Sequence, residues 1–176
     1  MDDLADEIRR VEFEIPEPFE DIDFWPLGIV SPNDKPFRDR IDRILVVSPF
    51  VDDSFASELA QRQFPMYLLS RGETLARLQD ETLKQFGKVW ILDDTATPEP
   101  GETEQEGDAN ATLEADGVEN HDIPLVGLHA KVYVVDAGRN ASVFTGSANA
   151  TAAAFHRNVE FLVQLCGKKS CCGIDA

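Results

Sequence analysis

Short apolar runs alternate with amphipathic segments through the middle of this 176-residue chain. Arg43–Val47 is a β-branched run that stops at a Ser-Pro pair, which is typical of a buried strand. The expected elements are a strand at Arg43–Val47, a helix from Asp53 or Ser54 to about Gln63, a strand at Met66–Leu69, a helix at Glu73–Phe86 and a strand at Lys88–Leu92. This order predicts an α/β layer fold with some parallel strand pairing.

The C-terminal part continues the strand pattern with a hairpin. The expected elements are a strand from His129, a turn at Ala137–Asn140, a strand at Ser142–Thr145, a tight turn at Gly146, a helix through Phe155 and a last strand at Val159–Leu165. Together with the preceding elements they predict a mixed β-sheet flanked by helices.

Five residues of this hairpin have side chains or backbone suited to one ligand, a phosphate. Alternation along a strand would direct His129 and Lys131 to the same face. Lysine supplies positive charge, and histidine supplies a nucleophilic or proton-carrying nitrogen near neutral pH. Gly146 permits a tight strand-to-helix turn, and Ser147, Asn149 and the N–H groups of a helix start suit an anionic oxygen.

The HxKx4D triplet at 129–136 followed by GSxN at 146–149 resembles the signature of the phospholipase D superfamily. An acidic residue at 160 adds a further match. Nine residues separate Asp136 from Gly146, a longer connection than is usual in the family, and a longer hairpin loop would absorb it. The resemblance covers about residues 40–166 and implies a phospholipase D-like half-domain. Residues 48–52 also resemble the opening strand and turn of such halves.

The resemblance implies a two-step displacement through a phosphohistidine, with His129 as either the nucleophile or the general acid. Lys131 and Asn149 would bind the non-bridging oxygens, with a hydroxyl hydrogen bond from Ser147. Glu160 is expected to orient an imidazole. The remaining motif residues, Asp136 and Gly146, are expected to be structural. No metal and no cofactor are implied, because the lysines of two motifs neutralise the charge.

Each of these residues also has a plain structural alternative. Lys131 could cap a surface, Ser147 could only hold the turn, and Glu160 could be an exposed residue of an alternating strand. His121 and His156 are expected on the surface, with a substrate-side role as the alternative for His156. A serine hydrolase using Ser147 is disfavoured, because the glycine of a G-x-S-x-G elbow is absent. The three cysteines suggest neither a disulfide framework nor a metal site.

Charge and composition divide the chain into segments. Of its 33 acidic residues, ten lie in residues 1–25 and eleven in 93–122, which contain no base. We expect an irregular segment at 1–40, the phospholipase D-like domain at 41–166 with a disordered acidic insertion at 93–122, and a tail at 167–176 that is the truncated end of a longer chain. Outside the acidic segments the charge is near balance, so the net charge of −17 does not exclude nucleic acid.

A metal-independent phosphodiesterase is therefore the predicted function, with DNA or RNA preferred over lipid as substrate. No run of transmembrane length and no signal peptide occurs, so we expect a cytoplasmic protein without integral membrane contact. The chain has one motif, so the second must come from a homodimer partner or from a second half of a longer chain. Two alternatives stay open: an inactive half-domain that serves in binding or dimerisation, and a phospholipase or phosphatidyltransferase.

Overall fold

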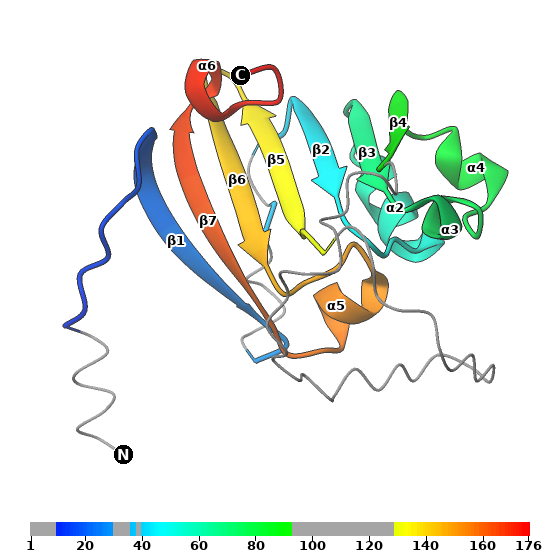
Figure 1. Cartoon of the computed structure of the whole chain (residues 1–176), viewed down its shortest axis with the longest axis horizontal. Helices are drawn as coiled ribbons and strands as arrows, with labels where there is room; N and C mark the ends of the chain where they lie inside the picture. The colour runs from blue at the N-terminus through cyan, green and yellow to red at the C-terminus, as the bar shows by residue number, and fades with distance from the viewer. Residues whose placement is uncertain (1–9, 30–35, 38–39, 93–128) are drawn as a thin grey trace, which may run out of the picture.

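A seven-stranded sheet organises the computed structural model, which describes residues 10–29, 36–37, 40–92 and 129–176 (Figure 1). The strand order is β1-β7-β6-β5-β2-β3-β4. The strands are β1 (Phe19–Leu27), β2 (Arg43–Val47), β3 (Met66–Ser70), β4 (Lys88–Ile91), β5 (Val132–Ala137), β6 (Asn140–Gly146) and β7 (Glu160–Lys168). The helices are α2 (Asp53–Ala60), α3 (Gly72–Leu75), α4 (Asp80–Leu83), α5 (Ala152–His156) and α6 (Lys169–Cys172).

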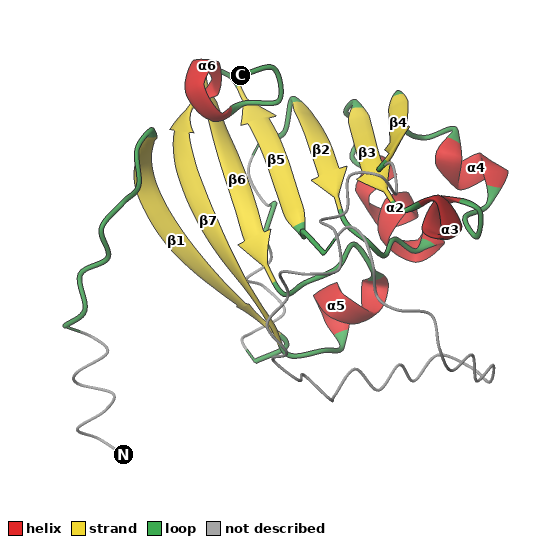
Figure 2. Cartoon of the chain, in the orientation of Figure 1, coloured by secondary structure: helices red, strands yellow, loops and turns green. Residues whose placement is uncertain are grey.

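The sheet is mixed, which confirms the predicted α/β class (Figure 2). β2, β3 and β4 pair in parallel, because α2, α3 and α4 return the chain to the same end of the sheet. β5 pairs antiparallel with β2 and β6, and β6 and β1 both pair antiparallel with β7. A short turn joins β5 to β6 within the predicted 137–140 segment.

The core lies on one face of the sheet, under the helices. Phe55, Ala56 and Leu59 of α2 and Ala154 of α5 are buried against it. The strand residues that meet them are Ile44, Val46, Met66, Leu68, Tyr133, Phe144 and Leu162, all of them buried. They alternate with less buried residues along each strand, as a sheet with one helix-covered face requires.

The single helix predicted at Glu73–Phe86 is wrong, since two short helices occupy that range. Gln79 has extended backbone angles of φ −68° and ψ 146° and interrupts the helical path. Its N–H donates to Asp53 Oδ1 at 3.0 Å, so a contact distant in sequence stabilises the break. Two apolar residues at the ends of the predicted helix, Leu75 and Phe86, are nevertheless buried in the core.

The irregular segment predicted at 1–40 also needs correction. Phe19–Leu27 is a nine-residue edge strand paired with β7. Pro26 has no backbone N–H to donate, and it is tolerated there because an edge strand pairs on one side only. Residues 11–15, which precede this strand, form no regular secondary structure. Residues 93–122, predicted to be an acidic disordered insertion, lie outside the described residues.

The predicted tail continues the fold. The boundary expected at residue 166 falls inside β7, which runs to Lys168 and is followed at once by α6. Figure 1 shows α6 at one end of the sheet and α5 at the other. The two ends therefore have separate surroundings, and the motif turn belongs to the end with α5.

Candidate functional site

Strand pairing brings the three motif segments to one edge of the sheet. Val132 of β5 pairs with Thr145 of β6, and Gly146 pairs with Leu162 of β7. The residues just before β5, just after β6 and at the start of β7 therefore lie on neighbouring strands. They are the segments that contain His129, Ser147 and Glu160.

His129 and Lys131 precede the strand in which they were predicted, since β5 begins at Val132. His129 is exposed and Lys131 is half-buried. Lys131 Nζ donates to the backbone carbonyl of His129 at 3.2 Å. The ammonium group thus lies beside the histidine backbone, just before the start of the strand.

Tyr133 connects this strand to the GSxN turn. Its hydroxyl donates to the carbonyl oxygen of Ala148 at 2.9 Å, in a fully buried position. Burial raises the pKa of Tyr133, and the negative charge of Glu160 raises it further. The hydroxyl therefore remains a donor, and it holds the turn against the strand that follows His129 and Lys131.

A hydrogen-bonded cluster joins the turn to β7. The Ser147 hydroxyl donates to Glu160 Oε2 and accepts from the N–H of Phe161 at 3.0 Å. Asn158 Nδ2 donates to Glu160 Oε1 at 3.4 Å. In this arrangement the Ser147 proton is directed to Glu160, and both carboxylate oxygens of Glu160 accept from neighbouring side chains.

Gly146 is required by close approach of the next strand. A Cβ at this position would lie 2.0 Å from the carbonyl oxygen of Phe161, far inside van der Waals contact. Ser147 then donates its backbone N–H to that same carbonyl at 3.0 Å. A glycine here lets β6 and β7 stay paired up to the start of the turn.

Asn149 is half-buried and lies between two fully buried alanines, Ala148 and Ala150. Its Oδ1 is buried without a hydrogen-bond partner in the part of the chain that the structure describes. A buried acceptor without a donor is costly, so this amide has unused hydrogen-bonding capacity. The Nδ2 group of the same amide is the one able to donate to a phosphate oxygen.

Two residues after β2 hold the turn from the other side, and sequence analysis assigned them no role. Ser48 is fully buried, and its Oγ accepts from the N–H of Ala150 at 3.1 Å. Asp52 accepts from the N–H of Ala152 at 2.8 Å and from Phe55 at 2.7 Å, so one carboxylate caps α5 and α2 together. The one sequence signal that pointed to these two residues was the resemblance of residues 48–52 to the opening strand and turn of a half-domain of the family.

Asp136 lies at the opposite end of β5 and is fully buried. Its carboxylate accepts from Arg43 Nε at 2.5 Å and from the N–H of Ile174 at 3.2 Å, and Lys169 Nζ lies 3.3 Å away. The carboxylates of Asp175 and Asp136 raise the pKa of Arg43. Asp136 therefore holds α6 and the following residues onto the sheet.

His156 ends α5 at the surface, where its Nε2 pairs with Glu58 Oε2 of α2 at 2.6 Å. His121 lies outside the described residues.

The cysteines are free thiols, and burial raises the pKa of Cys172. Within 10–29, 36–37, 40–92 and 129–176, no three metal-ligating side chains are grouped closely enough to hold an ion.

The motif arrangement agrees with a match to a known family. A family model described as cardiolipin synthase, phospholipase D-like domain matches residues 58–172, more than half of the chain. The chain belongs to the phospholipase D-like family. The phospholipase D-like match begins inside α2 and ends with α6, so it includes every motif segment, and the predicted family is confirmed.

Several solved structures are similar to this phospholipase D-like chain. NucT from Helicobacter pylori is 19% identical, with a TM-score of 0.39, and the alignment covers 70% of this chain and 67% of NucT. Nuc from Salmonella typhimurium, a phospholipase D family member, is 15% identical, with a TM-score of 0.38 and coverage of 72% and 68%. Yeast tyrosyl-DNA phosphodiesterase is 12% identical, with a TM-score of 0.42, and the 82% of this chain that aligns spans only 31% of that enzyme.

No match was found among curated proteins. None of the helices in the described ranges is long and apolar enough to cross a membrane.

Proposed function

We propose that this chain is a metal-independent phosphodiesterase whose complete site takes a second motif from a second copy or from another part of the same protein. One observation carries the proposal. The β5–β6 pairing and the Tyr133–Ala148 hydrogen bond bring the His129–Lys131 segment and the Ser147–Asn149 turn to one edge of the sheet. An imidazole, an ammonium group and a carboxamide at one edge suit attack on a phosphodiester.

The chemistry requires two imidazoles. In the first step a histidine nitrogen bonds to phosphorus as the bond to the leaving oxygen breaks, and a second histidine protonates that oxygen. In the second step water attacks phosphorus, gives its proton to the second histidine, and the P–N bond breaks. A phosphorylated imidazole cannot also serve as the acid, so His129 supplies one of these roles and the second motif supplies the other.

Lys131 and Asn149 Nδ2 would bind the non-bridging oxygens, and the lysine of the second motif would share the neutralisation of charge. Glu160 and Ser147 hold the turn through their mutual hydrogen bond. When substrate enters, the Ser147 hydroxyl, which lies in the turn itself, would exchange Glu160 for a phosphate oxygen. Glu160 would then be released to accept from an imidazole.

Nucleic acid is the substrate class that we propose first. Of the five basic residues in 129–176, Arg139, Lys168 and Lys169 lie at the α6 end of the sheet, away from the motif. Lys131 and the exposed Arg157, which follows α5, belong to the motif end and supply its positive charge. Local positive charge beside a phosphate site favours a polyanion.

A lipid phosphodiester is the second candidate, because apolar side chains are exposed near the same turn. Val159 is 70% exposed, Phe161 is 46% exposed, and Ile29 is 68% exposed. Phe161 bonds to Ser147 through its backbone, and Gly28 packs against the backbone of residues 158 and 159. An apolar rim of this kind suits acyl chains.

The test is hydrolysis of bis-p-nitrophenyl phosphate in the presence of EDTA. We expect activity that His129→Ala abolishes and that His156→Ala, a matched histidine at the surface of α5, retains. Equal activity in both variants would contradict the assignment of His129. Single-stranded oligonucleotides and phospholipid micelles, compared under the same conditions, then distinguish the two substrate classes.

A further inference from the structure

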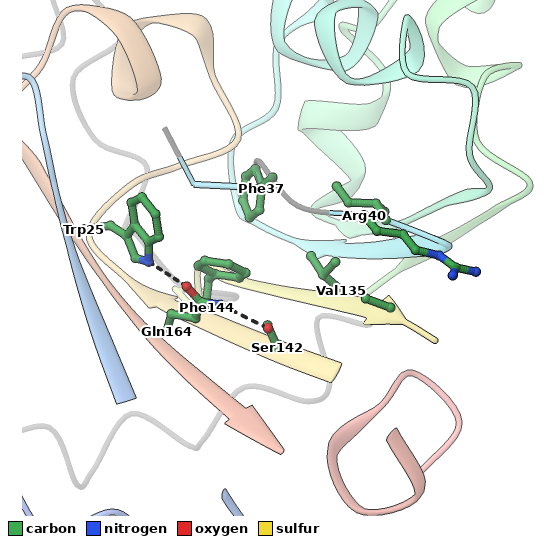
Figure 3. A pocket seen from close by; sticks show the side chains of 9 residues that line it. Trp25, Phe37, Arg40, Val135, Ser142, Phe144 and Gln164 are labelled. Atoms are coloured by element: carbon green, nitrogen blue, oxygen red, sulfur yellow. Dashed lines mark hydrogen bonds between the residues drawn. The ribbon is translucent and has the colours of Figure 1, made fainter. Parts of the chain in front are cut away.

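A cavity of about 180 Å³ lies on the helix-covered face of the sheet, apart from the motif edge (Figure 3). Its wall on β5 and β6 is centred on the Val135–Ser142 pair, three steps along the ladder from Val132–Thr145. At about 3.3 Å per residue, this places the cavity roughly 10 Å from the motif end of the strands. The lining residues are Trp25, Phe37, Arg40, Ile41, Val135, Ala137, Ser142, Phe144 and Gln164.

The floor of this cavity is a polar network among the mainly apolar residues of this face. Gln164 lies between Trp25 and Ser142, as Figure 3 shows, and accepts from Trp25 Nε1 at 2.7 Å. Its amide nitrogen donates to Ser142 Oγ at 3.1 Å and to Cys166 Sγ at 3.2 Å. Trp25 therefore fixes which way the Gln164 amide faces, and three strands contribute to one preorganised floor.

The network leaves one donor and one acceptor for a ligand. Both N–H groups of Gln164 are used, but its carbonyl oxygen has a second lone pair beyond the bond from Trp25. Ser142 Oγ accepts from Gln164, so its own proton must point elsewhere, and Cys166 Sγ at 3.3 Å is only a weak acceptor. A ligand carbonyl can take that proton while a ligand N–H donates to Gln164.

The walls favour a flat and uncharged ligand. Trp25, Phe37 and Phe144 present aromatic rings to the cavity, and an apolar cavity of about 150 Å³ is large enough for benzene. Arg40 at the rim is paired with Asp42 at 2.7 Å, so its charge is already balanced. No unbalanced charge in the lining calls for an ionic ligand.

We propose that this cavity binds a small, neutral, planar ring with a cyclic amide edge, the chemistry of a pyrimidine base. The amide edge pairs with Ser142 and Gln164, and the ring stacks against the aromatic wall. This binding site is separate from the phosphodiesterase site and does not depend on the proposed function. It gives the chain a second class of ligand, which binds in the cavity on the helix-covered face of the sheet.

Uracil is the probe, and fluorescence of Trp25 is the signal. Trp90→Phe removes the other tryptophan, so the whole protein with this one background change reports on the cavity alone. We expect saturable quenching by uracil and about tenfold weaker binding of its di-N-methylated form, because methylation removes the N–H that pairs with Gln164. Ser142→Ala should weaken uracil binding to a similar degree.

Uracil and its methylated form are compared on the same Trp90→Phe protein, so this test does not depend on whether any other variant folds. Equal binding of uracil and its methylated form would overturn the amide-edge assignment, and no saturable signal at millimolar uracil would overturn the site. His129→Ala should leave uracil binding unchanged. An inactive phosphodiesterase with intact uracil binding, or the reverse, therefore separates the two proposals.

Discussion

Tyr133→Phe tests the connection between the two motif segments. The substitution removes only the hydroxyl that donates to Ala148 at 2.9 Å, and the ring stays in its contacts with Phe37, Phe55 and Phe155. Tyr133 is 0% exposed, so water cannot replace the lost donor without rearrangement. A buried carbonyl left without its partner costs about 1–3 kcal/mol, and we expect the free energy of unfolding to fall by that amount.

Urea denaturation measures this change. The midpoints of the variant and the parent chain are compared, provided that the unfolding free energy depends on urea concentration with the same slope in both. Tyr67→Phe is a matched control, because the chain has two tyrosines and Tyr67 is only half-buried on β3. The control should change the unfolding free energy by less than about 0.5 kcal/mol. If Tyr133→Phe is no more destabilising than Tyr67→Phe, the hydroxyl does not hold the turn and the reasoning fails.

Three further predictions concern the supports of the sheet. Asp136→Asn should cost about 3 kcal/mol in urea denaturation, because it leaves Arg43 without its buried partner, whereas Asp175→Asn at the surface should change stability far less. Ser48→Ala removes the acceptor of the Ala150 N–H and should cost about 1–3 kcal/mol by the same measurement; an unchanged midpoint would show that this contact is dispensable. The N–H of Gly138 and the Arg40 side chain hold the pKa of Asp42 below its ordinary 3.8, so its contribution is present above that pH and is lost as pH falls through the lowered pKa. Melting temperatures across the acid range should therefore fall less steeply for Asp42→Asn than for the parent chain, and parallel curves would contradict this linkage.

The fold could be predicted where local pattern and tertiary environment agree. β2 and β3 are apolar runs bounded by turn residues, and the structure places them as predicted, in parallel. β1 was missed, because Phe19–Leu27 mixes acidic residues, aromatic residues and a proline, and only pairing with β7 makes it a strand. The 73–86 helix was overpredicted, since the Gln79–Asp53 contact that interrupts it is not a local signal.

The candidate site was predicted through residue types with fixed spacing. His129, Lys131, Ser147, Asn149 and Glu160 were all proposed this way, and strand pairing places their segments on neighbouring strands. Their supports could not be found, because a buried serine after β2 has no distinctive spacing. Ser48 and Asp52 act through contacts about 100 residues away, which only the folded chain reveals.

The most direct test of the central claim, that one motif is half of a phosphodiesterase site, is to measure mass and activity on the same chromatographic fractions. Light scattering gives the mass, and EDTA-resistant hydrolysis of bis-p-nitrophenyl phosphate gives the activity. We predict that any activity is confined to fractions of at least twice 19.5 kDa and is lost after His129→Ala. Full activity in a fraction of 19.5 kDa would contradict the claim, because a single chain would then complete the reaction with the one motif it has.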